Sequence, residues 1–178
     1  MLPNSASCWS RLIPEIMGVA GCGKSSVGMA LSQACGIPYR DGDALHPAAN
    51  LAKMTAGLAL VDADRWPWLD LVAGALRDGA PLMVGCSALK RVYRDRIRAG
   101  AGGQVLFVHL SGDRAVIAAR MAAREGHFMP LSLLDSQFAA LEAPGADEFA
   151  LTVDIDRTLT EIVARIRRDP RFPGACAG

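Results

Sequence analysis

The sequence predicts a three-layer α/β/α fold, in which helices cover both faces of a five-stranded parallel sheet. Short apolar runs alternate with longer helical stretches along the chain, and this alternation is typical of βαβ units. The apolar runs are continuous rather than alternating, which suits strands that are buried on both faces. Because no repeat or linker divides the chain, we expect a single domain over residues 1–178, with irregular tails at residues 1–11 and 171–178.

Five segments are predicted as strands: residues 12–18, 37–41, 81–86, 104–110 and 149–153. The first is the least regular, because Pro14 removes a backbone donor and Glu15 places a charge where a central strand should be buried. These two residues leave open whether the strand starts near residue 12 or only at Ile16. Helical patterns follow the strands, at residues 24–35, 65–79, 89–100, 113–124, 133–142 and 158–168.

Composition excludes several classes of protein. The formal net charge is +1, so no broad basic field is available to attract nucleic acid or an acidic membrane. The five cysteines are widely spaced and form no C-x-x-C pair, which argues against a disulfide framework or a zinc site and favours a cytoplasmic location. No apolar run approaches the roughly 20 residues of a membrane span, and the start of the chain lacks a signal-peptide pattern.

Residues 18–25 read GVAGCGKS and match the G-x-x-x-x-G-K-[ST] pattern of a phosphate-binding loop. The loop lies between a predicted strand and a predicted helix, so its amides and the helix N-terminus form an anion site. Lys24 would pair with the β- and γ-phosphates of ATP, and Ser25 would hold Mg²⁺. The residues expected to contact the nucleotide are Gly18, Val19, Ala20, Gly21, Cys22, Gly23, Lys24, Ser25 and Ser26.

The thiol of Cys22 has two interpretations. The amides of the loop and the neighbouring lysine could lower its pKa and make it reactive, with bound nucleotide protecting it from alkylation. Alternatively, Cys22 is a small residue that a tight loop tolerates.

Two carboxylates follow the second predicted strand, in Asp41-Gly42-Asp43. We expect them at the carboxyl edge of the sheet, where open α/β sheets bind their ligands. Asp41 could reach Mg²⁺ through water, while Asp43 accepts the proton of an attacking hydroxyl. The alternative is a capping role for the helical segment that starts near His46.

Several long segments resemble the small P-loop gluconokinases, which are related to shikimate and nucleotide monophosphate kinases. They include MGVAGCGKSSVG, DGDALHPAANLAKMTAGLALVDADRWPWL, CSALKRVYRDRIR and ARMAAREGHFMPLSLLDSQFAALE. The resemblance implies a P-loop kinase fold with a small lid, and a homodimer that uses ATP and Mg²⁺ to phosphorylate D-gluconate to 6-phospho-D-gluconate. Departures from the family pattern are Pro14, Glu15, Cys22 and Gly85.

Gluconate has one carboxylate and a row of hydroxyls, so its pocket needs a few cations and many hydrogen-bonding groups. By similarity to the shikimate kinases, we expect Arg65 to bind the substrate carboxylate; an ordinary surface arginine is the alternative. The other residues expected on the substrate side are Asp43, His46, Lys53, Ser87, Lys90 and His127. Trp66 and Trp68 are expected to pack their helix rather than to stack on a sugar acid.

Arg120 and Arg124 lie one helical turn apart, directly before a stretch with loop chemistry, GHFMP. This placement predicts a lid at about residues 121–135 that closes over ATP, excludes water and brings arginine to the transferring phosphoryl group. The alternative is two exposed arginines on a solvated helix face. The expected catalytic residues are Lys24, Asp43, Arg120 and Arg124.

The remaining expectations concern the nucleotide base and two buried residues. Adenine is expected near residues 154–158, by fold analogy. Cys86 is expected to be an inert buried thiol, and His109 an ordinary histidine of the sheet. Two further functions stay open: a kinase of another small hydroxy acid such as shikimate, and a nucleotide-binding module that transfers no phosphate.

Overall fold

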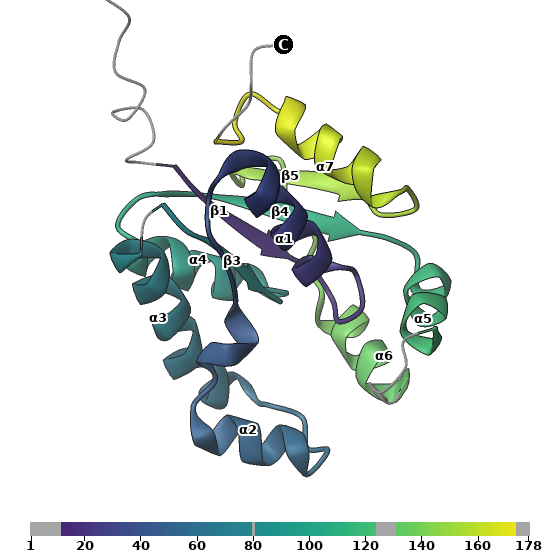
Figure 1. The fold of residues 1–178 in the computed structure, drawn as a ribbon. Coiled ribbons are helices and arrows are strands. Elements are labelled where there is room, and N and C mark those ends of the chain that lie inside the picture. Colours follow the sequence, from purple (N-terminus) through teal and green to yellow (C-terminus); the bar gives the residue numbers. More distant parts are fainter. Residues whose placement is uncertain (1–11, 80, 124–130, 174–178) are drawn as a thin grey trace, which may run out of the picture.

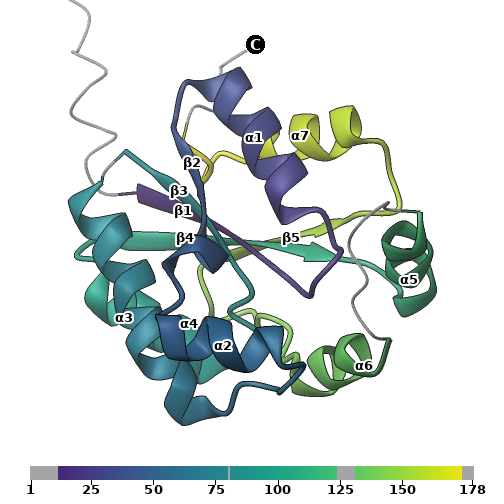
Figure 2. The same cartoon turned by 60° about the horizontal axis from the view of Figure 1, so that its bottom comes forward.

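The computed structural model of the chain describes residues 12–79, 81–123 and 131–173. Five parallel strands form one sheet in the order β2-β3-β1-β4-β5, shown in Figures 1 and 2. They are β1 (Leu12–Met17), β2 (Tyr39–Asp41), β3 (Met83–Cys86), β4 (Gln104–Ser111) and β5 (Ala150–Asp154). Each lies within two residues of its predicted bounds, which confirms the predicted α/β fold. Because β1 is central, the loop after it emerges in the middle of the carboxyl edge.

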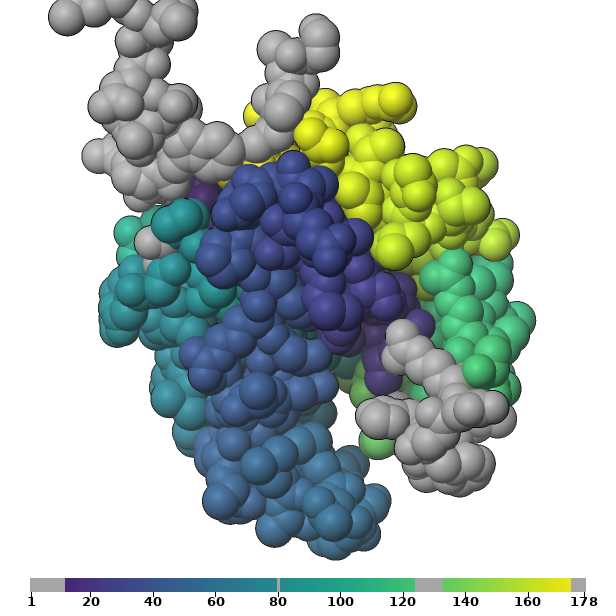
Figure 3. Space-filling model, in the orientation of Figure 1, coloured from purple at the N-terminus to yellow at the C-terminus, as the bar shows by residue number. Residues whose placement is uncertain are grey.

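Helices cover both faces of the sheet. The helices α1 (Lys24–Cys35) and α7 (Leu159–Arg168) pack on one face, and α3 (Asp62–Asp78) and α4 (Arg91–Gly100) on the other. The remaining helical elements extend beyond the carboxyl edge; they are the 3-10 helix η2 (Gly42–Leu45), α2 (Ala48–Thr55), α5 (Arg114–Ala122) and α6 (Leu131–Ala140). In Figure 3 the surface is hollowed beside the blue segment of α2.

Each face of the sheet has its own hydrophobic core, because side chains alternate between the two faces along a strand. Ile16 and Val108 pack into the core below α1 and α7. Val84 and Phe107 pack against α3 and α4, where Trp68 is the largest buried side chain. Burial on both faces explains the continuous apolar runs of the sequence.

β1 begins at Leu12 and includes both irregular residues, so the alternative of a start only at Ile16 is wrong. β1 pairs with β4 from Leu12 onward but with β3 only from Glu15, so Pro14 lies where the strand is paired on one side. Strands tolerate proline in that setting.

Glu15 is completely buried, and neither of its carboxyl oxygens has a hydrogen-bond partner among the described residues. Burial raises the pKa of Glu15 well above its usual value, although the Arg94 guanidinium and the nearby Cys86 thiol oppose the shift. Burial therefore favours the neutral form of this side chain over the charged form.

The first residues of the expected irregular C-terminal tail pack against the fold. Residues 171–173 form neither helix nor strand, yet Phe172 is buried in the core below α1 and α7, and Arg171 pairs with Asp169 at 2.9 Å. Residues 1–11 and 174–178 lie outside the described residues. Within the described ranges, no helix has the length and apolar character needed to cross a membrane.

Candidate functional site

The phosphate loop connects β1 to α1 at the centre of the carboxyl edge. Gly23 caps α1 with a φ of 101°, a left-handed conformation that a side chain would strain, and this turns the loop into the helix N-terminus. The Lys24 ammonium donates to the carbonyls of Gly18 and Val19, at 3.1 and 3.2 Å, and so lies over the loop. The amide of Gly18 donates to the Ser87 carbonyl at 3.4 Å, which ties the loop to the end of β3.

Cys22 lies in the phosphate loop, and its side chain is buried. It is 1% exposed and packs in the core below α1. Burial raises the pKa of Cys22, and the Lys24 charge only partly offsets this effect. Burial and the raised pKa favour packing over reactivity as the explanation of Cys22. Cys86 is fully buried with a raised pKa as well, which agrees with an inert thiol.

Ser25 and the two carboxylates after β2 come together at the carboxyl edge. The Ser25 hydroxyl donates to Oδ2 of Asp41 at 2.9 Å, and Oδ1 of Asp41 accepts from the amide of Asp43 at 3.0 Å. Asp41 thus caps η2, which begins at Gly42 rather than near His46, and reaches the phosphate loop with the same carboxylate; its role toward Mg²⁺ stays a prediction. The side chain of Asp43 is 72% exposed.

The donor set of Ser25 and Asp41 fits Mg²⁺, which takes oxygen ligands and is commonly held by one or two protein groups together with substrate phosphates and water. The hydroxyl and the carboxylate already contact each other at 2.9 Å, so both could hold one ion. Within the described residues, there is no group of three or more His, Cys, Asp or Glu side chains that could hold a metal ion by itself.

His46 connects Asp43 to the side of the site that carries α2 and α3. Its ring stacks on the Trp68 indole with centroids 4.1 Å apart, and its Nε2 atom lies 3.9 Å from Oδ1 of Asp43. Burial lowers the pKa of His46, although Asp43 opposes the shift. Trp68 is buried and donates to the Gly42 carbonyl at 2.8 Å, which confirms that it packs its helix.

The two predicted substrate lysines each pair with a carboxylate from the first turn of α3. Lys53 contacts Asp64 at 2.6 Å, and Lys90 contacts Asp62 at 2.9 Å. Hydrogen bonds lower the pKa of both carboxyls: the Tyr93 hydroxyl and then Lys90 act on Asp62, and Lys53 acts on Asp64. The lysines are therefore held in place by α3 rather than extended into solvent.

Arg65 lies on the same turn of α3, beside this cluster. Its guanidinium is 5.8 Å from the centroid of the Tyr93 ring, and its Nη2 donates to the Leu60 carbonyl at 3.4 Å. Trp66 contacts Tyr93 edge-on, with ring centroids 5.5 Å apart. Trp66 is thus packed between helices, as predicted, while the guanidinium of Arg65 keeps donors available for a ligand.

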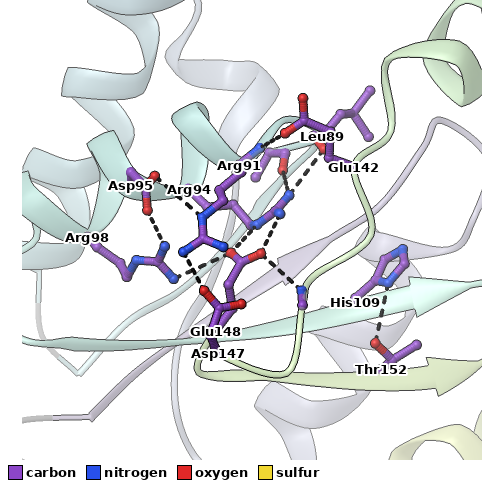
Figure 4. A network of polar contacts seen from close by, with 12 residues as sticks. Leu89, Arg91, Arg94, Asp95, Arg98, His109, Glu142, Asp147, Glu148 and Thr152 are labelled. Carbon is purple, nitrogen blue, oxygen red and sulfur yellow. Dashed lines mark hydrogen bonds and ion pairs between the residues drawn. The ribbon is translucent and has the colours of Figure 1, made fainter.

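A buried ion pair between Arg94 and Glu148, shown in Figure 4, supports the loop at residues 87–90. Arg94 donates to both oxygens of Glu148 at 2.7 Å, and the two side chains are 0% and 1% exposed. Its Nη1 also donates to the carbonyls of Ala88 and Leu89, each at 3.1 Å. Ala88 has a φ of 40°, a strained value for a residue with a side chain, so Arg94 stabilises an unfavourable turn.

Arg120 anchors α5 to the segment after β5. Its Nη2 donates to the Ile155 carbonyl at 2.5 Å and to the Arg157 carbonyl at 3.4 Å. Beside it, a cavity of about 370 Å³ opens next to the phosphate loop; among its lining residues are Gly21, Ser26, Arg120, Arg157, Leu159 and Ile162. An apolar floor flanked by two guanidinium groups suits a nucleotide base, and the cavity adjoins the segment where adenine is expected.

The structure thus gathers most predicted residues at one edge of the sheet, in three groups. Lys24 and Ser25 belong to the phosphate loop. Arg120 lies on one side of this loop, where it lines the cavity of about 370 Å³. On the other side lie the residues expected to bind substrate, which are Asp43, His46, Lys53, Arg65, Ser87 and Lys90. Arg124, His127 and the middle of the expected lid, residues 124–130, lie outside the described residues.

Sequence reasoning missed several residues of this site. Gln137 of α6 accepts a hydrogen bond from the phosphate-loop amide of Ala20 at 2.6 Å. Asp62 and Asp64, which form ion pairs with Lys90 and Lys53, belong to the segment VDADRW. Two acidic residues directly before Arg65 form a local pattern that could have drawn attention to them. For Gln137 no local signal existed, because a glutamine in an ordinary helix carries no recognisable pattern.

No model of a known protein family matches the chain. The chain is 47% identical over 142 residues to the gluconokinase of Gluconobacter oxydans, covering 78% of this chain and 79% of that one. It is 41% identical over 158 residues to the thermosensitive gluconokinase of Escherichia coli, covering 86% and 84%. A solved gluconokinase structure from Sinorhizobium meliloti matches with a TM-score of 0.82 at 46% identity, covering 93% of this chain and 91% of that one. On this evidence, together with its parallel sheet and phosphate loop, the chain belongs to the gluconokinase family.

Proposed function

We propose that this chain transfers the γ-phosphoryl group of ATP to a hydroxyl of D-gluconate, forming 6-phospho-D-gluconate, with Mg²⁺ as the metal. The observation that carries the proposal is the position of Asp43. Its amide is bonded to Asp41, which contacts Ser25 of the phosphate loop, and its carboxylate lies 3.9 Å from His46. One exposed carboxylate therefore adjoins both the phosphate site and the expected substrate residues.

The phosphate side acts by positioning and charge neutralisation. The loop amides and the Lys24 ammonium bind the phosphates of ATP, and the base occupies the cavity beside Arg120. Ser25 and Asp41 hold Mg²⁺, which neutralises phosphate charge when bound. Arg124 is proposed to close over the nucleotide with the lid at residues 121–135, which would exclude water from the transfer.

The substrate side orients the acceptor hydroxyl. Arg65 presents a planar fork of donors to the carboxylate of gluconate. Asp43 accepts the proton of the attacking hydroxyl as the new bond to phosphorus forms. The groups proposed to bind the remaining oxygens are His46, Lys53, Ser87, Lys90 and His127.

A coupled assay of ADP formation over a panel of sugar acids, with shikimate included, tests this function. Gluconate should be the preferred substrate, and Lys24→Ala should lower kcat about 10²–10³-fold while the circular dichroism spectrum stays unchanged. ADP formation that does not depend on any acceptor, or a preference for shikimate, would contradict the proposal.

Asp43→Asn tests the proton acceptor separately and should lower kcat about 10²–10⁴-fold. Asp78→Asn is a matched control, because Asp78 is 68% exposed and lies at the far end of α3, away from the site. The control should turn over at the wild-type rate. Equal rates for the two variants would remove Asp43 from the mechanism.

The organisation of the protein is a further part of the proposal. We propose a single domain, a homodimer and a cytoplasmic location, as the family resemblance and the cysteine pattern predict. Light scattering coupled to size-exclusion chromatography tests the dimer, and a mass of 18.8 kDa would reject it.

A further inference from the structure

Tyr39, the first residue of β2, is lodged between two glycines of neighbouring elements. A Cβ atom at Gly28 of α1 would lie 2.2 Å from its ring, and one at Gly85 of β3 would lie 2.1 Å from its hydroxyl oxygen. Real side chains do not approach so closely, so both glycines make room for the tyrosine. Gly85, a departure from the family pattern, is thus explained by the Tyr39 hydroxyl.

The Tyr39 hydroxyl is buried and has no hydrogen-bond partner in the part of the chain that the structure describes. It abuts Gly85, whose register partner on β2 is Asp41. Burial raises the pKa of Tyr39, the Asp41 charge raises it further, and the neighbouring Ser25 hydroxyl opposes the shift. A buried hydroxyl without a partner is unfavourable, and a bound ion or a functional role commonly explains one.

Ser25 could be the hydrogen-bond acceptor that the Tyr39 hydroxyl lacks. A serine hydroxyl has one proton and two lone pairs. The proton of Ser25 is donated to Asp41 at 2.9 Å, so both lone pairs remain available. One can face a metal ion, and the other can accept a hydrogen bond from the protein side, where the Tyr39 hydroxyl lies.

We propose that Tyr39 is a positioning residue for the Mg²⁺–nucleotide site, and that its hydroxyl donates to Oγ of Ser25 in the bound state. This bond, with the one to Asp41, orients the remaining lone pair of Ser25 toward the metal. The inference rests on the proposed function, because it assigns Mg²⁺ to Ser25.

Calorimetric binding of a non-hydrolysable ATP analogue to the Tyr39→Phe protein tests the proposal. With Mg²⁺ present, the variant should bind about 2- to 10-fold more weakly than wild type, the effect of one net hydrogen bond. In EDTA, both proteins should bind the metal-free analogue equally. The unfolding midpoint of the variant should be unchanged or higher, because the substitution removes an unpartnered buried hydroxyl.

Tyr93→Phe is the matched control, since it removes the same group from the substrate side, where Tyr93 donates to Asp62. This control should bind the Mg²⁺–analogue complex like wild type. Equal binding by Tyr39→Phe and wild type, or equal weakening with and without Mg²⁺, would show that Tyr39 only fills space and would overturn the inference. Failure of the wild-type protein to bind the Mg²⁺ complex would overturn the proposed function itself, and the inference with it.

Discussion

Replacing Arg94 by methionine should be one of the most destabilising single changes in this protein. The guanidinium is 0% exposed, donates twice to Glu148 and also binds the carbonyls of Ala88 and Leu89. Methionine fills much of the same volume but leaves a buried carboxylate and two carbonyls without this partner. Arg98, which lies 3.5 Å from Glu148, compensates only in part.

The magnitude follows from the burial of the pair. Removing one partner of a buried ion pair costs about 3–5 kcal/mol, because the remaining charge stays in a medium that solvates it poorly. For a domain of this size, each kcal/mol lowers Tm by about 2–4 °C, so Arg94→Met should unfold about 6–20 °C below wild type. Removing both charges, in Arg94→Met/Glu148→Leu, should recover much of the loss, leaving about 1–3 kcal/mol for the unpaired carbonyls.

Urea unfolding at pH 7, followed by circular dichroism, measures these differences. Arg96→Met is a matched control on the same helix, because Arg96 and its partner Asp70 are 44% and 53% exposed and such pairs contribute about 0–1 kcal/mol. A loss below about 1 kcal/mol for Arg94→Met, or a double variant as unstable as the sum of the two single ones, would refute the reasoning.

Two buried titratable groups should give opposing pH dependences of stability. Burial lowers the pKa of His109 from 6.5 to about 4, so the unfolded chain binds more protons between these values and this contribution to stability rises with pH. The raised pKa of Glu15 has the opposite sign, since the folded state retains a proton above pH 4.5 and loses stability as pH rises. Urea midpoints between pH 4.5 and 6.5 should therefore rise more steeply than in wild type for Glu15→Gln and less steeply for His109→Gln, where the lowered pKa of His46 still contributes a rise; parallel profiles would contradict both assignments. The buried thiol of Cys22 should be alkylated at the rate of global unfolding, with or without nucleotide, as peptide mass spectrometry would show; rapid labelling of the folded protein would contradict the packing assignment.

The phosphate loop was more predictable than the cluster of Lys53, Lys90, Asp62 and Asp64, for a physical reason. A phosphate loop is made by consecutive residues whose backbone conformations and helix N-terminus create the anion site, so its composition reveals it. Lys53 and Lys90 were predicted to lie on the substrate side, but their partners Asp62 and Asp64 belong to another helix. Which carboxylate meets which lysine depends on the packing of α2, α3 and α4, and no local pattern encodes it.

The sequence by itself determined the order of the strands along the chain, the helices other than α2, the phosphate loop and the two carboxylates after β2. Hydrophobic periodicity and loop chemistry act over a few adjacent residues, which is why these features could be predicted. Only the tertiary structure decided that Cys22 faces the core, that Glu15 is buried within a central strand, and that Arg94 meets Glu148 from 54 residues away. The environment of a side chain is set by chain segments remote in sequence. Burial, charge pairing and protonation therefore emerge only when those segments pack together.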